Sequence, residues 1–355
     1  MSAEPVSKPP PSLLRRAAPR VVLSLLIAAG FVWLLKRGGL PFAPPAQGMQ
    51  ELRWWGLPAF GALALVAAAL RTWRWIYLLR PMAPSLRPWR VFGIGLVGFS
   101  AVFFAPLRLG EVVRPYLMSR EGEVTFVQAV GTVAAERIID GLVLVLMTAA
   151  ALAMSTPLSP LPNRVGSLPI PVSLVPHTIV LATAVFSLAF AAMALFYFAR
   201  RPAQRLSRAV LGVISARLAD FGAGTVERLA ESFGFLPSWQ RSAPFLRNTL
   251  LYWLVNGCAH YALLRGVGLP ATLPQAFVTM GVIGLGSLLP AGPGMFGAFQ
   301  VATYTSLAMF NSEHDVLTKG AVAVFGSYLV QLTLNALQGA AGSVLLARLP
   351  RTTSS

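Results

Sequence analysis

Long apolar segments separated by shorter polar ones dominate the hydropathy pattern of the chain. Residues 179–198 form a run of 20 uncharged residues, and about 20 apolar residues are what a helix needs to cross the hydrocarbon core of a bilayer. Segments of similar character are residues 21–35, 54–79, 126–154, 248–264 and 320–347. The pattern therefore predicts an all-α fold with about six membrane-spanning helices.

The first of these segments has a second interpretation. A basic tail over residues 1–20 followed by an apolar run is also the pattern of a signal peptide. Lys36 and Arg37 follow the run directly, however, and no A-x-A cleavage sequence comes after it. We therefore favour a retained first helix.

Two further apolar segments are interrupted by glycine and proline. Residues 91–107 contain several glycines, and the run over residues 266–312 holds 47 residues without a charge, which is too long for one helix. Each meets a P-x-x-x-G sequence, one in each half of the chain. This short motif is common and the match could be coincidence, but paired interrupted segments are typical of inverted-repeat transporters. We therefore predict two inverted repeats with re-entrant broken helices at 91–110 and 275–294.

The composition changes this picture in one respect, by excluding soluble classes of protein. Hydrophobic residues make up 55% of the chain and charged residues only 12%, against about a quarter charged in soluble proteins. Disordered, collagen-like and ordinary cytosolic proteins are therefore excluded. The formal charge is +17; in a membrane protein such an excess anchors cytoplasmic loops, so nucleic acid is not an expected partner.

Positive charge also orients the predicted segments. With the N-terminus inside, the inner loops hold 19 Lys and Arg residues and the outer loops hold 4, as the positive-inside rule requires. We therefore predict a bacterial inner-membrane protein with both termini in the cytoplasm. Its predicted parts are a basic tail over residues 1–20, a first repeat over 21–198, a basic amphipathic connector over 199–247, a second repeat over 248–347 and a tail over 348–355.

Charged residues inside apolar segments are the strongest candidates for function. Glu136, Arg137 and Asp140 lie within one apolar segment, while Arg108 and Arg114 flank the end of the first interrupted one. An ionisable group at the bilayer centre costs at least roughly 2.5–3.5 kcal/mol, so these groups must pair or line a wet cavity. Two interpretations stay open: a structural ion-pair cluster, or a site where arginine binds a lipid phosphate.

The chain lacks the usual signatures of an enzyme. H-E-x-x-H, G-x-S-x-G, Walker A and C-x-x-C sequences do not occur, and there is one cysteine and three histidines. We therefore predict no catalytic residue, no metal site and no cofactor. Two polar stripes at helical spacing, Tyr252-Asn256-His260 and Gln331-Asn335-Gln338, are candidates to face a cavity, although His260 alone is more simply a hydrogen-bonded packing residue.

Four segments together resemble a known family. They are Arg74-Trp75, the P-x-R-x-G-E-x-x-R-P sequence at residues 106–115, the E-R-x-x-D-G sequence at residues 136–141 and the L-P-A-G-P-G-M-F-G-A-F-Q sequence at residues 289–300. The combination resembles the flippase-like membrane proteins related to the transmembrane region of lysylphosphatidylglycerol synthase, including YbhN-like proteins. The resemblance implies two inverted repeats that move an anionic or aminoacylated lipid between leaflets.

Two departures from the family limit what the resemblance implies. The soluble aminoacyltransferase domain of full synthases has no counterpart in these residues, so lipid lysylation is not expected. Gly297 and Gln300 stand where relatives often have an acidic or histidine side chain, which weakens the case for proton coupling there.

We therefore predict a flippase-like transporter whose partners are membrane lipids with anionic headgroups. The alternative is a non-transporting accessory or scaffold subunit beside lipid- or glycan-biosynthesis enzymes. Arg114 is expected nearer the aqueous edge than Arg137. The predicted substrate-binding residues are Arg74, Arg108, Glu111, Arg114, Glu136, Arg137, Asp140 and Gln300. The predicted loop-shaping residues are Pro106, Gly110, Pro290, Gly292, Pro293 and Gly294.

Overall fold

The computed structural model describes residues 13–41, 43–105, 110–213, 215–289 and 291–350, which are predominantly helical. Within those ranges the β pairing is limited to an isolated bridge between Val165 and Leu168. The prediction of an all-α polytopic membrane protein is therefore confirmed.

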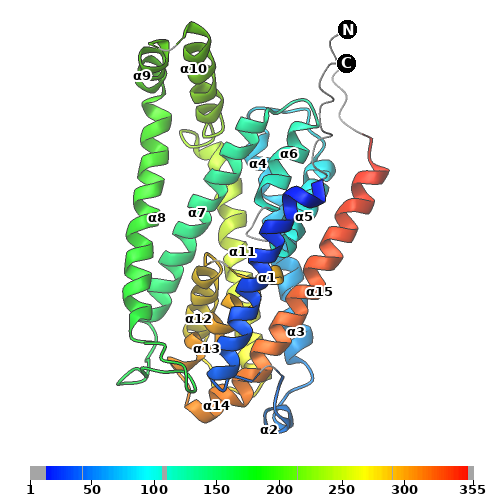
Figure 1. The fold of residues 1–355 in the computed structure, drawn as a ribbon, viewed down its shortest axis with the longest axis vertical. Helices are drawn as coiled ribbons and strands as arrows, with labels where there is room; N and C mark the ends of the chain where they lie inside the picture. The colour runs from blue at the N-terminus through cyan, green and yellow to red at the C-terminus, as the bar shows by residue number, and fades with distance from the viewer. Residues whose placement is uncertain (1–12, 42, 106–109, 214, 290, 351–355) are drawn as a thin grey trace, which may run out of the picture.

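The helices form an elongated bundle, shown with its long axis vertical in Figure 1. In chain order they are α1 (Leu13–Arg37), α2 (Ala46–Gln50), α3 (Gly56–Trp73), α4 (Trp75–Leu79), α5 (Pro88–Phe104), α6 (Val113–Ser119), α7 (Phe126–Ala153), α8 (Leu174–Phe198), α9 (Arg200–Gly212), α10 (Ala216–Glu231), α11 (Trp239–Gly266), α12 (Leu273–Gly286), the 3-10 helix η2 (Pro293–Met295), α13 (Ala298–Ala308), α14 (Glu313–Leu317) and α15 (Lys319–Arg348).

Three helical segments in the described ranges are both long and apolar enough to cross a membrane. They are Gly56–Leu79, Leu174–Phe198 and Glu313–Arg348. The sequence predicts about six spans. Helices α1, α7 and α11 have matching lengths of 25, 28 and 28 residues, but they include more polar residues, and α7 contains three charged side chains near its middle. Length and composition together therefore mark three spans, whereas helix length alone would add α1, α7 and α11.

Two helices are too short to cross the bundle. Helix α5 has 17 residues and α12 has 14, so at 1.5 Å per residue they reach about 25 and 21 Å, less than the roughly 30 Å of a hydrocarbon core. Helix α5 starts at the end of the bundle that carries α9 and α10, whereas α12 starts at the end that carries α2 and α14 (Figure 1). The segments predicted to be interrupted are thus short helices that enter from opposite ends, and α5 contacts η2 where the two segments meet.

The hydrophobic core is divided into two clusters along the bundle axis. One cluster includes Ala67, Leu144 and Tyr252, and the other includes Trp75 and Phe245. Helices α7 and α11 contribute to both clusters, whereas α3 contributes to the first and the consecutive helix α4 to the second. Between the clusters the chain passes through a layer of polar side chains, the location of the candidate site.

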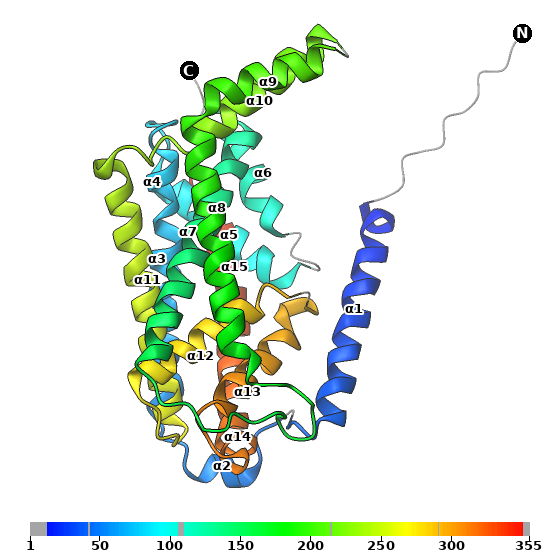
Figure 2. The ribbon, with the colours of Figure 1, turned by 90° about the vertical axis from the view of Figure 1, so that its left-hand side faces the viewer.

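Helix α1 stands beside the bundle and touches it at the second interrupted segment (Figure 2). A Cβ on Gly292 would lie 2.7 Å from the Cβ of Ala28, and one on Gly297 would lie 2.1 Å from the Cγ of Phe31. Both glycines therefore allow α1 to approach η2 and the start of α13.

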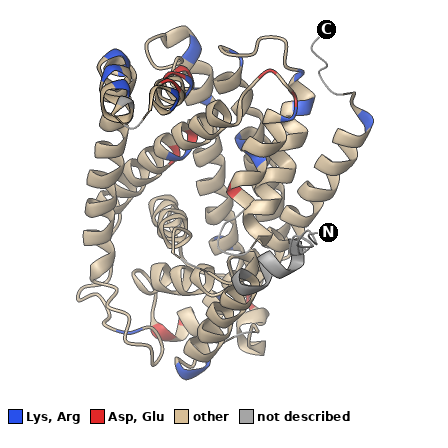
Figure 3. Ribbon diagram, turned by 45° about the horizontal axis from the view of Figure 1, so that its top comes forward, with Lys and Arg blue, Asp and Glu red and all other residues tan. Residues whose placement is uncertain are grey.

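Basic residues gather at the end of the bundle that carries α9 and α10 (Figure 3). Helix α1 begins at this end of the bundle and helix α15 ends there, and α6 lies at the same end (Figure 1). The loop between α7 and α8 lies at the opposite end with α14. The two groups of loops that differ in predicted charge are therefore separated in space, while the side that faces the cytoplasm stays a prediction.

Cysteine labelling should establish that orientation. In a Cys258→Ser background, cysteines at Asn163 and Glu313, which are exposed at the α2–α14 end, are expected to react with an impermeant maleimide in intact cells. A cysteine at Arg208, exposed on α9, should react only after permeabilisation. Labelling of Arg208→Cys from outside would reverse the predicted topology. Ser232 is unsuitable as a labelling position because it is buried against α7.

Candidate functional site

Four charged side chains from three parts of the chain form a buried ion-pair network. Arg74, at the junction of α3 and α4, donates to Asp140 Oδ2 at 2.5 Å and to Glu136 Oε1 at 3.2 Å. Arg114 from α6 donates to Glu136 Oε2 at 2.7 Å. Glu136 and Asp140 lie one turn apart on α7, and Thr249 on α11 accepts a further bond from Arg74 at 2.9 Å. The network is formally neutral.

The side chain of Arg114 reaches Glu136 by passing over a glycine of α5. A Cβ on Gly98 would lie 1.8 Å from the Cγ of Arg114. The guanidinium then lies 4.3 Å from the ring centroids of both Trp75 and Phe99, within cation–π distance of each. The first interrupted segment is therefore fixed to α7 through one arginine.

Replacing Gly98 with alanine should destabilise the protein because the new methyl group overlaps the Arg114 side chain. Overpacking of this kind costs about 1–3 kcal/mol. The matched control is Gly30→Ala on α1, where a Cβ meets no atom within 4 Å. We expect a lower melting temperature in detergent for Gly98→Ala only; equal melting of both variants would show that Arg114 is free to move aside.

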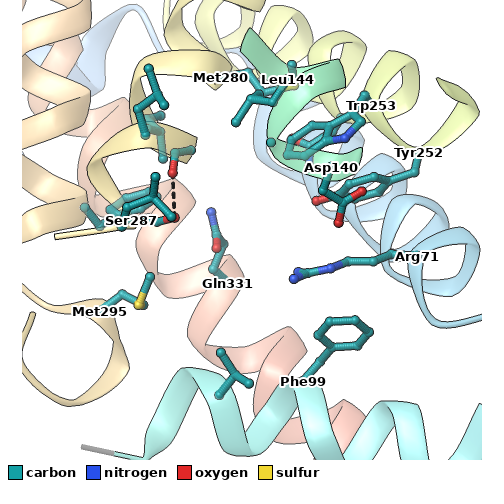
Figure 4. Close-up of a pocket in the computed structure, with 18 of the residues that line it drawn as sticks. Arg71, Phe99, Asp140, Leu144, Tyr252, Trp253, Met280, Ser287, Met295 and Gln331 are labelled. Atoms are coloured by element: carbon teal, nitrogen blue, oxygen red, sulfur yellow. Dashed lines mark hydrogen bonds between the residues drawn. The ribbon is translucent and has the colours of Figure 1, made fainter. Parts of the chain in front are cut away.

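A cavity of about 280 Å³ lies beside the network. Its polar walls include Arg71 of α3, Arg137 and Asp140 of α7, Asn256 of α11 and Gln331 of α15. Figure 4 shows the guanidinium of Arg71 extended into the open space, with Gln331 across from it. The ends of both interrupted segments contribute apolar wall. The residues are Phe99, Val102 and Phe103 from α5, Ile283 and Leu285 from the last turns of α12, and Leu288 just after it.

Arg71 is the charge in this cavity that the described chain does not neutralise. Its guanidinium lies 3.9 Å from the ring centroid of Phe99, yet it makes no ion pair or hydrogen bond with any residue that the structure describes. Arg74, one helical turn away, is bound to two carboxylates. Arg71 was not among the residues predicted for the site; its i, i+3 spacing to Arg74 was the available signal that it faces the interior.

Arg137 occupies an intermediate position on the cavity wall. Its Nη2 lies 3.8 Å from Glu111 Oε1, and the two side chains are 27% and 34% exposed. Arg114 is only 1% exposed. The expectation that Arg114 lies nearer the aqueous edge than Arg137 is therefore wrong, because α6 directs Arg114 beneath α5.

The two predicted polar stripes both face this region. Asn256 and His260 line the cavity from α11 with Tyr252, and Gln331 and Asn335 line it from α15. Gln338 lines a neighbouring cavity of about 150 Å³ that shares Arg71. Their prediction as cavity-facing residues is confirmed. The packing interpretation of His260 also holds, since its Nδ1 bonds the backbone oxygen of Asn256 at 2.9 Å.

The other predicted residues lie outside the cavity walls or outside the described residues. Gln300 accepts a hydrogen bond from the backbone N–H of Gly297 at 2.6 Å and so caps α13. Gly110 packs against the α5 backbone, since a Cβ there would lie 2.1 Å from the carbonyl carbon of Ala101. Pro293 and Gly294 form η2, where Gly294 has a φ of 70°. Pro106, Arg108 and Pro290 are not among the described residues.

The cavity therefore has the chemistry of an anion-binding site with hydrogen-bonding walls. Among the residues that the structure describes, no group of three His, Cys, Asp or Glu side chains is placed to hold a metal ion. The cation that is left to interact with a ligand is a guanidinium, which binds phosphate through paired hydrogen bonds.

Comparison with known proteins gives one result. A family model for the lysylphosphatidylglycerol synthase transmembrane region matches residues 21–334, which extends from α1 into α15. No curated protein and no solved structure matches the chain.

Proposed function

The chain belongs to the lysylphosphatidylglycerol synthase transmembrane-region family, and from this premise we propose that it moves an anionic, phosphate-bearing lipid between the two leaflets of a membrane. The family indicates a membrane protein of lipid metabolism or transport. Transport by a carrier, without chemical change of the lipid, is our proposal within that range. The membrane would be a bacterial inner membrane, with the α9–α10 end in the cytoplasm.

The observation behind the proposal is the uncompensated Arg71 on the cavity wall. A cation within the hydrocarbon region costs several kcal/mol unless a partner or water compensates it. Arg74 and Arg114 have carboxylate partners within the described chain. Arg71 has none there, so a phosphate entering the cavity would meet a guanidinium that needs no other bond to be broken first.

Transport between leaflets also requires access to the cavity from both sides. Exchanging α3 with α11, α5 with α12, and α7 with α15 maps the main helix contacts onto one another: α5 packs on α15 as α12 packs on α7, and α3 packs on α11. This correspondence supports two inverted repeats around the cavity. In transporters of that type, the site near the midplane is exposed alternately as one repeat rocks against the other.

The remaining charges would hold and adjust the site. We assign Arg74, Arg114 and Glu136 to positioning α7 against the first interrupted segment, since all three are buried and mutually bonded. Arg137 and Glu111 form a long, partly exposed pair. A phosphate beside Arg71 would compete with Glu111 for Arg137, which makes this pair the element that changes when lipid binds.

Reconstitution into liposomes tests the proposal directly. Wild-type protein should accelerate the loss of a fluorescent phosphatidylglycerol from the outer leaflet, measured by dithionite quenching against protein-free vesicles. An imposed proton gradient would then show whether transport is coupled. If wild-type protein moves none of several anionic lipids under either condition, the accessory-subunit alternative replaces the transporter.

A further inference from the structure

We infer that the cavity selects a headgroup in which the phosphate is joined to an uncharged polyol, such as glycerol or a sugar, in preference to an aminoacylated headgroup. This inference rests on the proposed function and specifies the substrate of the same site. It comes from the hydrogen-bonding groups that the cavity leaves unpaired.

Buried polar atoms without a partner gather at this cavity. The described residues contain eight such side-chain atoms, and five belong to residues of the cavity wall. Three are donors and two are acceptors. They are Arg71 Nε, Arg137 Nε, Trp253 Nε1, Asp140 Oδ1 and His260 Nε2. Since buried polar groups are nearly always satisfied in folded proteins, this concentration indicates a bound polar group with both acceptors and donors.

The two acceptors require a donor that a phosphodiester does not have. His260 Nδ1 lies 2.9 Å from the backbone oxygen of Asn256; a carbonyl only accepts, so this nitrogen bears the hydrogen and Nε2 of the neutral ring is an acceptor. His260 is 5% exposed. Asp140 is bound to Arg74 through Oδ2, which leaves Oδ1 for a ligand. Hydroxyl groups or ammonium groups could supply these donors.

The charge of the walls favours hydroxyl over ammonium. The carboxylate on the cavity wall, Asp140, already has Arg74 as its counter-ion at 2.5 Å, and Arg71 and Arg137 are cationic. A lysyl or alanyl headgroup would therefore bring an ammonium group into a cavity with net positive charge. The neutral amides of Asn256, Gln331 and Asn335 can each donate to and accept from a hydroxyl, as polyol recognition requires.

The size of the cavity is consistent with a headgroup alone. Its volume of about 280 Å³ lies just below the range of about 300–1,000 Å³ for small-molecule sites. A glycerol phosphate or sugar phosphate therefore fits within it only if the acyl chains stay in the surrounding lipid. The same chemistry occurs in a free polyol phosphate, so an experiment must separate the two sources.

Native mass spectrometry of the purified protein, with lipids added in equimolar competition, provides that experiment. The probes are phosphatidylglycerol, phosphatidic acid, lysylphosphatidylglycerol and free glycerol 3-phosphate. We expect phosphatidylglycerol to be retained about tenfold over phosphatidic acid, since one or two hydrogen bonds of ordinary strength correspond to that ratio. Lysylphosphatidylglycerol and free glycerol phosphate should bind more weakly than phosphatidylglycerol.

Two histidines in similar local settings supply a test variant and its control. His260→Phe removes the acceptor and keeps a ring against Phe60, so it should reduce the preference for phosphatidylglycerol over phosphatidic acid to about twofold or less. His177→Phe is the control, because His177 also contacts the backbone oxygen four residues earlier but is exposed on α8. The control should retain the full preference.

The outcomes separate the inference from the proposed function. Preferential binding of lysylphosphatidylglycerol, or equal binding of phosphatidylglycerol and phosphatidic acid, would overturn the inference while transport could still be measured in liposomes. If free glycerol 3-phosphate binds as tightly as phosphatidylglycerol, the ligand of the site would be a soluble polyol phosphate and not a lipid. The expected preference without any liposome transport would support the headgroup class and overturn the transporter.

Discussion

Replacement of Arg71 by alanine is expected to reduce lipid translocation by about 10- to 100-fold while leaving the fold intact. A hydrogen bond between charged groups contributes about 1.5–3 kcal/mol, which corresponds to that range. Arg71 makes no ion pair with any described residue, so its loss leaves no carboxylate stranded. The change in unfolding free energy should then be about 1 kcal/mol, from the lost contact with Phe99.

Two companion variants make this measurement specific. Arg71→Lys keeps the charge but not the paired donors, so translocation should be intermediate. Arg80→Ala removes an exposed arginine at the α9–α10 end and should leave translocation unchanged. Translocation by Arg71→Ala at the wild-type rate would mean that the headgroup does not pass through this cavity.

Replacement of Glu136 by alanine should give the largest loss of stability among single substitutions of the charged residues. Glu136 is fully buried and bonded to both Arg74 and Arg114. Its removal leaves two buried arginines with Asp140 as their remaining partner within the network. Breaking a buried pair in this way costs about 3–5 kcal/mol. Thermal melting in detergent should show the loss directly.

The exposed carboxylate of Glu227 on α10 provides the control for this experiment. Glu227→Ala should melt as the wild type does, because its side chain lies at the surface. If Glu136→Ala also melts normally, water must reach the network, and the buried ion pairs would not be what fixes the first interrupted segment to α7.

The sequence predicted the helices of this fold better than it predicted which charged side chains are buried. Apolar runs and interrupted segments located the long helices and both short helices, α5 and α12, because hydropathy and glycine or proline breaks are local properties. The polar stripes on α11 and α15 were recognised for the same reason, since i, i+4 spacing defines a helix face. These predictions needed no knowledge of which helices pack together.

Which arginine is neutralised could not be predicted, because it depends on contacts between distant parts of the chain. Arg74 and Asp140 are 66 positions apart, and Arg114 reaches Glu136 only because Gly98 leaves room for the arginine side chain. The sequence therefore placed Arg114 near water and overlooked Arg71. Local spacing shows that two residues share a face, whereas the packing of α3, α7 and α11 decides which of them meets a carboxylate.

The division of the core into two clusters has a consequence for how such a carrier would avoid opening its cavity at both ends at once. Each cluster closes the bundle on one side of the polar layer, so each can act as a separate seal. Loosening the cluster around Trp75 would open the cavity toward the α9–α10 end while the cluster around Tyr252 stays packed. The reverse movement would open the other end. Because the layer between them is held by ion pairs and long polar side chains, it can be re-formed after each movement without unpacking both seals at once.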